Sequence, residues 1–600
     1  MMKRHWLRLC LILLLFTSFN FQSVQAATVH TYVPIGSGYS SYTLQLFARQ
    51  AVQRDTDGVV ELLVIPITFA TDAYNISNGE RQQNLTLADN RRGLVESACN
   101  AVKLPGQTCH AVLAPVLVRD DAYLQSNLDL FPADLDGMYI LGGDQTIAML
   151  VVANTPFEAK MAAAFNAGAA VGGNSAGAAV QSLNMIGGYT GNNGPENGFQ
   201  QGSVDLWLPP DRRGLSFGTT SIVLDQHEFQ RGRIARLINT SFTTGLLGIG
   251  ADADTGMVIT DEDTLTDVTG ATSVIVIDQQ TYNATGRFAG PTNSLSIHGL
   301  ATHLVPPGAF GYDITHRRPV VDGHPLPAPS IAGRSFNALH LPSGYGPLIL
   351  AGDLSGDRTG SVTQRFVSLS GGNSARLLVL ALGYAKNTDA QADAKAFAAA
   401  LQSQAAGSVQ WFVVDAKNQT AVQNAISSAT GILVTAPDQS RVMNALAGIA
   451  PALRNAWAGG KAVLADNAAA AALGQAMSTD STPTSSSLEG DSMEDFLFSG
   501  VSIQAGLNWI PGIAVEPRMV MDRHWGRVYN HLYSNPALLG LGVDVNTAIE
   551  FTATGTTVWG RNTVLVADGR FATYGLGTND ALSARYVVLD TYIEGDALVP

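Results

Sequence analysis

Ser175 stands between Gly173 and Gly177, which is the G-x-S-x-G spacing of a nucleophile elbow. The small apolar residues before Ser175 predict a strand, and the alanine-rich residues after it predict a helix. Backbone N–H groups at the start of such a helix can bind the oxyanion that forms during acyl transfer. The segment therefore predicts a nucleophilic serine, with a purely structural turn as the alternative.

A serine hydroxyl is a weak nucleophile until a base accepts its proton. His227 is the best candidate for that base, because it ends an apolar stretch that predicts a buried strand. Asp225 lies two residues earlier and projects from the same face of that strand. Arg233 and Arg236 follow at helical spacing, where they could bind a substrate carboxylate or neutralise acidic groups. A structural histidine and a solvated basic turn are the alternatives.

Short apolar stretches alternate with alanine-rich stretches along the chain. Residues 61–67 and 138–141 predict strands, and residues 156–167 predict a helix. This alternation predicts a mostly parallel sheet with helices on both faces. Because reactive groups gather beyond the carboxyl ends of the strands in such folds, we expect Ser175 and His227 to lie close together.

The chain contains two copies of one pattern. The matched blocks are 137–146 with 431–440, 171–176 with 463–469, 224–227 with 521–524, and 246–252 with 538–544. This alignment sets Ala468 opposite Ser175 and His524 opposite His227. The second copy then lacks the nucleophile, and we expect it to be catalytically inactive.

The expected organisation has four parts: a signal peptide at 1–26, a catalytic first copy at 28–320, a linker at 321–345 and a degenerate second copy at 346–600. The first part has a basic start, an apolar run at 9–16 and a small-residue cleavage site before Ala27. No later stretch has the roughly 20 apolar residues of a membrane span. We therefore expect a soluble protein, secreted or periplasmic.

The chain is acidic, with a net charge of −14 that becomes −17 without the signal peptide (32 basic against 49 acidic residues). This charge argues against nucleic acid as a partner and favours a cationic substrate, although solubility alone also explains it. Cys99 and Cys109 flank a turn and could form a disulfide in an oxidising compartment, with two free thiols as the alternative. No cysteine and histidine cluster indicates a metal site, and we expect no cofactor.

Four segments together resemble the cyanophycinases, which belong to the serine peptidase family that also holds dipeptidase E. The segments are 142–145 (GGDQ), 172–178 (GGNSAGA), 225–227 (DQH) with the arginines after it, and 248–250 (GIG). The resemblance covers the first copy throughout and the second more weakly. It implies a flavodoxin-like fold related to class I glutamine amidotransferases. The activity it implies is a serine exopeptidase that cuts cyanophycin, a polyaspartate with arginine on each side chain, into β-Asp-Arg dipeptides.

The resemblance also assigns roles to residues. Ser175 is the implied nucleophile and His227 the implied general base. The implied substrate-binding residues are Gln145, Asn174, Asp225, Arg231, Arg233 and Arg236. The oxyanion is expected to be bound at Gly143 and Ala176.

One position departs from the family pattern, in which a glutamate after the Gly-Ile pair completes the triad. Ala253 takes that place here. Asp254 is our assignment for the acid, provided that the loop before Gly248 shifts the register by one. Without that shift, strand alternation turns both Asp252 and Asp254 away from the glutamate's side. The remaining candidates are Glu196 and Asp205, which lie between serine and histidine as the acid does in dipeptidase E-like members.

The expected substrate is a cationic or zwitterionic peptide polymer, with neither nucleic acid nor a membrane as partner. An Asp-X dipeptidase of the same family is one alternative, and a non-catalytic binding or scaffold protein is another. Cyanophycinases are dimers of single-copy subunits, so the resemblance implies that the second copy packs on the first within one chain. We therefore expect a monomer.

Overall fold

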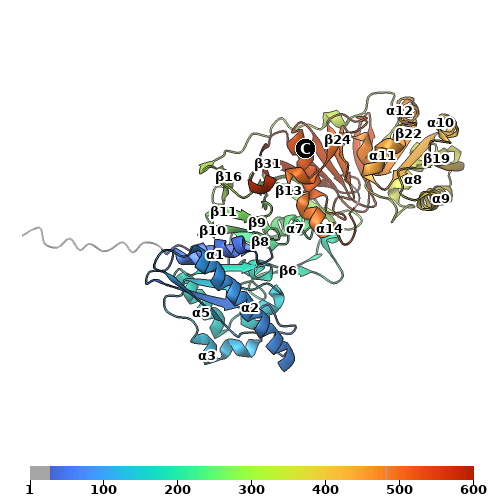
Figure 1. Ribbon diagram of the computed structural model, residues 1–600. Coiled ribbons are helices and arrows are strands. Elements are labelled where there is room, and N and C mark those ends of the chain that lie inside the picture. The colour runs from blue at the N-terminus through green and yellow to red at the C-terminus, as the bar shows by residue number, and fades with distance from the viewer. Residues whose placement is uncertain (1–27, 481–482) are drawn as a thin grey trace, which may run out of the picture.

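The computed structural model describes residues 28–480 and 483–600 (Figure 1). The signal peptide predicted at 1–26 lies outside the described residues. Figure 1 shows two α/β units at opposite ends of the molecule, one blue to cyan and one yellow to orange, with green and red strands between them. No helix in the two described ranges is long and apolar enough to cross a membrane.

The first unit is built on a ten-stranded sheet with the order β17-β16-β15-β11-β10-β1-β5-β4-β2-β3, in which β1 to β5 are all parallel. Its strands are β1 Thr31–Ile35, β2 Val59–Ile65, β3 Thr108–Leu113, β4 Gly137–Ile140, β5 Ala170–Asn174, β10 Thr255–Thr260, β11 Thr264–Gly270, β15 Phe310–Asp313, β16 Arg318–Val321 and β17 His324–Pro325. Successive side chains of a strand point to opposite faces, and helices α1 and α2 cover one face while α4 and α5 cover the other. The helices of this copy are α1 Ser41–Val52, α2 Asn78–Val102, α3 Gln125–Leu128, α4 Gln145–Val152, α5 Pro156–Asn166, α6 Ala176–Ala179 and α7 Ile234–Thr244.

The second unit repeats that topology. Its seven-stranded sheet has the order β20-β19-β21-β22-β18-β27-β28, which matches β3-β2-β4-β5-β1-β10-β11 of the first. Its strands are β18 Leu348–Ala351, β19 Arg376–Ala381, β20 Ser408–Val413, β21 Gly431–Ala436, β22 Ala462–Asn467, β27 Thr547–Thr552 and β28 Gly555–Gly560. The helices of this copy are α8 Ser361–Leu369, α9 Asn387–Ser403, α10 Gln419–Ser428, α11 Gln439–Leu446, α12 Ala450–Ala458, α13 Ala468–Leu473, α14 Leu488–Glu494 and α15 Trp525–Ser534. Helices α8 and α9 cover one face, and α10 to α13 cover the other. The predicted fold class, two tandem flavodoxin-like α/β units, is confirmed.

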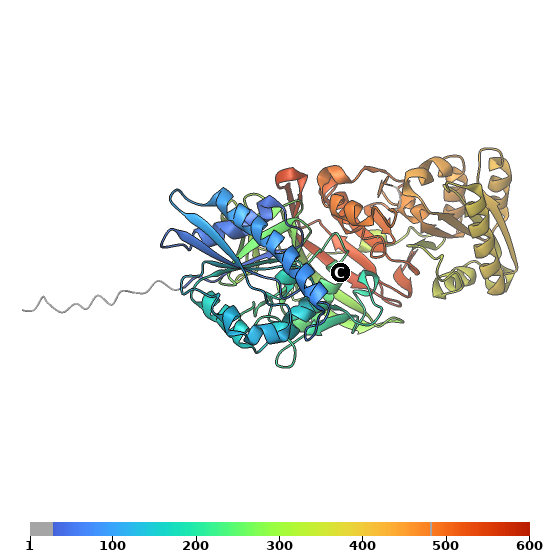
Figure 2. The same cartoon turned by 60° about the horizontal axis from the view of Figure 1, so that its bottom comes forward.

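A twelve-stranded sheet joins the two units (Figure 2). Its main order is β24-β23-β25-β26-β29-β31-β14-β12-β9-β8, and β13 and β30 pair with β14 and β31. Its strands are β8 Ile222–Gln226, β9 Leu247–Ala251, β12 Val274–Asp278, β13 Thr285–Ala289, β14 Ser294–Val305, β23 Ala476–Ser478, β24 Ile503–Ala505, β25 Ile513–Pro517, β26 Leu539–Val543, β29 Val564–Asp568, β30 Thr573–Leu576 and β31 Leu582–Tyr592. Strands β6 (Met185–Tyr189) and β7 (Val204–Trp207) form a separate hairpin.

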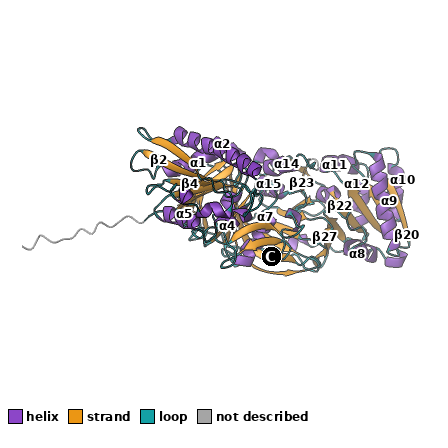
Figure 3. Ribbon diagram, turned by 90° about the horizontal axis from the view of Figure 1, so that it is seen from below, coloured by secondary structure: helices purple, strands orange, loops and turns teal. Residues whose placement is uncertain are grey.

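The central sheet places the two copies symmetrically. β14 and β31 pair antiparallel in its middle, with Leu300 opposite Leu589. From this pair outward, β12, β9 and β8 of the first copy mirror β29, β26 and β25 of the second. Helices α7 and α15 lie near each other in Figure 3, and their apolar side chains share one buried cluster with this sheet. The copies are therefore arranged about an approximate two-fold axis between β14 and β31.

Strand register identifies the residue of the second copy that corresponds to His227. The first residues of β8 and β25 pair with the first residues of β9 and β26. Counted from there, Arg518 occupies the place of His227, and both have a positive φ, 56° and 50°. The predicted match of His524 with His227 is therefore wrong. Glu516 takes the place of Asp225 by the same count.

The elbow segment aligns in the same way. Ile35 of β1 pairs with Asn174, and Ala351 of β18 pairs with Asp466. The next residue in each copy turns with similar torsions, φ 52° and ψ −118° at Ser175 against φ 56° and ψ −126° at Asn467. Asn467, not Ala468, is thus the counterpart of the serine.

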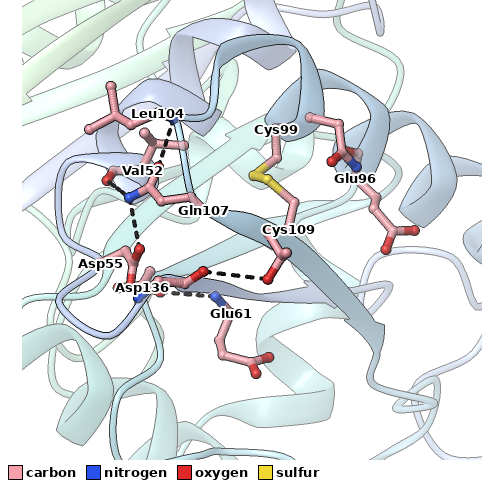
Figure 4. Close-up of a disulfide and its surroundings, with 12 residues drawn as sticks. Val52, Asp55, Glu61, Glu96, Cys99, Leu104, Gln107, Cys109 and Asp136 are labelled. Carbon is pink, nitrogen blue, oxygen red and sulfur yellow. Dashed lines mark hydrogen bonds between the residues drawn. A yellow bond between two sulfur atoms is a disulfide. The ribbon is translucent and has the colours of Figure 1, made fainter.

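A disulfide joins α2 to β3 in the first unit (Figure 4). Cys99 in the last turns of α2 is bonded to Cys109, ten residues later, with 6.0 Å between their Cα atoms. Beside it, the Gln107 amide donates to Val52 O and to the carboxylate of Asp55, which ties the turn to the end of α1. The pairing allowed by the sequence is formed, and the alternative of two free thiols is excluded.

Candidate active site

Ser175 lies on a strained turn between β5 and α6, as the elbow pattern predicted. Its φ of 52° is one that residues other than glycine rarely adopt, at a cost of about 1–3 kcal/mol. The backbone holds it there, because its N–H donates to Ile35 O at 2.9 Å. Gly177 is required by close approach, since a Cβ at that position would lie 2.1 Å from Ile140 O.

The structure brings Ser175 and His227 together. Ser175 Oγ lies 3.0 Å from His227 Nε2, and His227 Nδ1 lies 2.5 Å from Gln230 Oε1. An amide oxygen can only accept, so Nδ1 carries the proton and Nε2 is free to accept the serine proton. This is the arrangement of a nucleophile and its general base.

Burial keeps this imidazole uncharged. The pKa of His227 is lowered to about 3, first by loss of solvent and then by the positive charges of Arg231 and Arg233, against the hydrogen bond that the ring donates to Gln230. The ring is therefore neutral, the form required of a base, at all pH values well above 3. The same low pKa makes it a weak base.

Asp254 does not take the place of the triad acid. Its carboxylate lies against Gly38, where a Cβ would be 2.2 Å from Asp254 Oδ1. The chain turns at Asp254 with a φ of 49° before it enters β10. No hydrogen bond between Asp254 and His227 occurs in the described structure, so the assignment of Asp254 as the acid is not supported.

Two of the other candidate acids, Asp252 and Asp205, have structural partners. Asp252 is fully buried, and its Oδ1 accepts from the N–H groups of Phe229 and Gln230 at 3.0 and 2.9 Å. Burial raises its pKa to about 6 against those bonds. Asp205 accepts from the Trp207 indole and from Arg212, both on or beside β7. Glu196 lies in the short 3₁₀ helix Pro195–Asn197.

Two predicted substrate-binding residues pair with each other instead. Arg236 of α7 donates to Asp225 at the end of β8 through two bonds of 2.7 and 2.6 Å. Both side chains are 1 % exposed. The helix that follows the strand folds back onto it, so these two charges satisfy one another and are buried from solvent, while their role in the substrate pocket stays a prediction.

The remaining predicted binding residues lie in or near the site. Gln145 begins α4 after the N-cap Asp144, and its Nε2 donates to Ile186 O and Gly187 O in β6. Asn174 Oδ1 accepts from Gly142 N, which fastens the elbow to the end of β4.

The two other predicted arginines differ in exposure. Arg233 donates to the carbonyl and side-chain oxygens of Gln226, and burial lowers its pKa to about 9. The side chain of Arg231 is 43 % exposed and remains available to a substrate.

The predicted oxyanion donors flank the serine. Ala176 is the first residue of α6, whose opening N–H groups have no partner within the helix. Gly143 lies where a Cβ would come within 2.2 Å of Thr68 O, so only glycine fits. Within the described residues, neither amide donates to a protein acceptor, which leaves both available to a substrate oxygen.

Sequence reasoning missed two residues of the loop that follows β8, Gln230 and Glu228. Gln230 orients His227 by accepting a hydrogen bond from Nδ1, a contact that depends on the fold of the turn and has no local sequence signal. Glu228 is fully buried, and neither of its carboxyl oxygens has a hydrogen-bond partner in the described structure. Burial and the charge of Asp225 hold its pKa well above the usual range. In the second copy, Met519 occupies this place.

The second copy has neither a nucleophile nor a base at the corresponding positions. Asn467 replaces Ser175, and Arg518 replaces His227. The Arg518 guanidinium is bonded to Asp353 and, at 2.6 Å, to Asp522. An ion-pair cluster thus takes the place of the serine–histidine pair. No group of residues that could hold a metal ion occurs in the described part of the chain.

No known family model matches the chain. It is 30% identical over 175 residues to the cyanophycinase of Geminocystis herdmanii, which covers 28% of this chain and 60% of that protein. It is 28% identical over 228 residues to the cyanophycinase of Synechococcus elongatus, covering 36% and 67% of the two chains. The crystal structure of a peptidase from an acI-B1 Actinobacterium aligns with 42% of this chain and 91% of its own, at 18% identity and a TM-score of 0.30.

The matches are partial, and the chain spans about 60% of the length of the Geminocystis enzyme. Their names nevertheless agree with the motifs around Ser175, Gln145 and His227. Over part of its length, this chain is therefore similar in sequence to the cyanophycinases.

Proposed function

We propose that this protein is an exported serine-type peptidase that hydrolyses cyanophycin to β-Asp-Arg dipeptides. The observation that carries the proposal is the contact between Ser175 Oγ and His227 Nε2, with Gln230 fixing the histidine tautomer. A strained elbow that presents a serine to a neutral imidazole is an arrangement suited to acyl transfer.

The geometry supports a two-step reaction. His227 Nε2 would take the proton of Ser175 as its oxygen attacks the scissile carbonyl, and the imidazolium would then protonate the leaving amine. The amides of Gly143 and Ala176 would bind the oxyanion. Water would hydrolyse the acyl-enzyme with His227 again as the base. Because Gln230 is neutral, it stabilises the imidazolium less than a carboxylate would.

Different observations support the proposed substrate and the proposed compartment. Two relatives are cyanophycinases, and the net charge of −14 favours a substrate that carries guanidinium groups. Export is supported by the basic and apolar zones within 1–26 and by the disulfide between Cys99 and Cys109, a bond typical of oxidising compartments.

A non-catalytic polymer-binding protein is the second candidate. Gln230 favours it, because a neutral amide in place of the acid weakens the base, and the second copy has lost the pair altogether.

Ser175→Ala tests the proposal. Removing the nucleophile is expected to lower the turnover of insoluble cyanophycin by about 10³-fold or more and to abolish labelling by a serine-directed phosphonate. Ser97→Ala, at an exposed serine of α2, is the matched control and should behave as wild type. Turnover of Ser175→Ala within about tenfold of wild type would refute a serine mechanism. A wild type that binds the polymer without cleaving it would favour the second candidate.

A further inference from the structure

The histidine loop of the first copy, defined here as residues 227–233, meets its counterpart 518–524 of the second copy. Gly232 and Arg523 are equivalent positions in the alignment by strand register, and their φ values are 62° and 59°. They also touch, since a Cβ on Gly232 would lie 2.6 Å from Arg523 Cγ. Equivalent residues in contact place the pseudo-two-fold axis beside the histidine loop.

Arg523 makes a directed contact across this axis. Its Nη1 donates a short hydrogen bond to the backbone oxygen of Gln230. The side chain of Gln230 in turn holds His227 Nδ1, whose ring contacts Ser175. Gln230 is therefore bonded at its backbone to the second copy and at its side chain to the His227–Ser175 pair.

The loop is held from both copies at once. Asp252 of the first copy accepts from the N–H of Gln230, while Arg523 of the second donates to its C=O. Beside this peptide, Phe496 of the second copy stacks on Phe229 with ring centroids 3.5 Å apart. Gln230 is held at its N–H and its C=O, and the ring of the preceding Phe229 is stacked. Gln230 therefore has little freedom to move away from His227.

Arg523 also lies close enough to Glu489 and Arg231 to interact with their charges. Arg231 of the first copy lies 4.0 Å from Glu489 at the start of α14 in the second copy. The second copy thus reaches the most exposed of the predicted substrate-binding arginines as well as the base. An inactive copy that merely covered an apolar surface would need none of these polar contacts.

We propose that Arg523 of the second copy is a positioning residue for the catalytic pair of the first. It holds Gln230 so that His227 keeps its proton on Nδ1 and presents Nε2 to Ser175. The degenerate copy therefore serves as a built-in activator of its neighbour. This inference rests on the proposed serine peptidase function.

The test uses the full-length chain with Arg523→Met, which keeps an unbranched apolar stem against Gly232 and removes only the donors. Turnover of cyanophycin and the rate of phosphonate labelling of Ser175 are measured together with thermal unfolding. We expect kcat and the labelling rate to fall by about tenfold or more, with KM within about twofold and the melting temperature unchanged. Arg523→Lys, which retains a cationic donor, should recover part of the rate.

The shorter variant Arg523→Ala leaves space for a guanidinium ion, and millimolar guanidinium should restore part of its labelling rate without affecting wild type. Arg561→Ala, at an exposed arginine of the second copy, is the control and should label as wild type. Equal labelling of Arg523→Met and Arg561→Ala would overturn the inference. A loss of activity that only follows a loss of folded protein, with no rescue by lysine or guanidinium, would also overturn it, because Arg523 would then be a simple tether. If wild type and Arg561→Ala are themselves unlabelled, the proposed function fails and this inference falls with it.

Discussion

Among single side chains, the amide of Gln230 decides how strong a base His227 can be. Ser175 and His227 could be identified from the sequence because the glycine spacing and the strand end are local patterns. Gln230 could not, because its contact with Nδ1 depends on the turn that Asp252 imposes on the backbone. Asp225 was predicted as a pocket residue because nothing local shows that α7 folds back to pair it.

Gln230→Glu should strengthen the base. A carboxylate beside Nδ1 favours the imidazolium and raises the pKa of His227 from its value of about 3. At pH 8 we expect labelling of Ser175 to become about tenfold faster. Wild type should label at a constant rate down to about pH 5, since its histidine is deprotonated throughout, whereas the variant should slow as the pH falls through the raised pKa.

Gln82→Glu adds the same charge on the exposed surface of α2 and is the matched control for this experiment. A wild-type labelling rate of Ser175 that falls with a midpoint near pH 6.5 would contradict a buried, neutral His227.

At the level of elements, the turn after β8 is shaped by an aspartate at the end of the neighbouring strand β9. Asp252 caps the N–H groups of Phe229 and Gln230, and Asp544 lies at the corresponding place in the second copy with its pKa raised to about 7 by burial. Because the second copy keeps this residue although it lacks the serine and the histidine, we infer that its role is to build the turn. The alternation of strands and helices was predictable from hydrophobic periodicity. The register between copies was not, because sequence matching took the later histidine, His524, in place of Arg518.

Asp252→Ala and Asp254→Asn should therefore differ sharply. The first removes the buried acceptor of two backbone N–H groups and frees Gln230, so we expect labelling of Ser175 to slow by about tenfold or more. The second should stay within about twofold of wild type, because Asn546 occupies that place in the second copy with a similar φ of 55°. Thermal unfolding of both variants controls for global loss of structure. A larger effect at Asp254 would restore it as the catalytic acid.

In the whole molecule, the pairing of β14 with β31 joins the two copies through one continuous sheet. Each strand is more than ten residues long and buried, and the apolar cluster beneath them draws side chains from α7 and α15 alike. The repeat in the sequence predicted two copies, but it could not predict that they share a sheet, because pairing between strands almost 300 residues apart leaves no local signal.

Residues 28–320 alone should therefore self-associate. Without the second copy, β14 presents a long row of unpaired N–H and C=O groups, and the apolar side chains that face β31 and α15 are exposed to water. We expect the full chain to behave as a monomer near its formula mass of 63.1 kDa, less the signal peptide, in gel filtration with light scattering, and the fragment to form dimers or larger species and to label Ser175 more slowly. Leu300→Lys places a charge on the freed edge opposite the former site of Leu589, so it should shift the fragment towards the monomer. A fragment that is monomeric and as active as the full chain would show that the shared sheet is dispensable and that the second copy has an independent role.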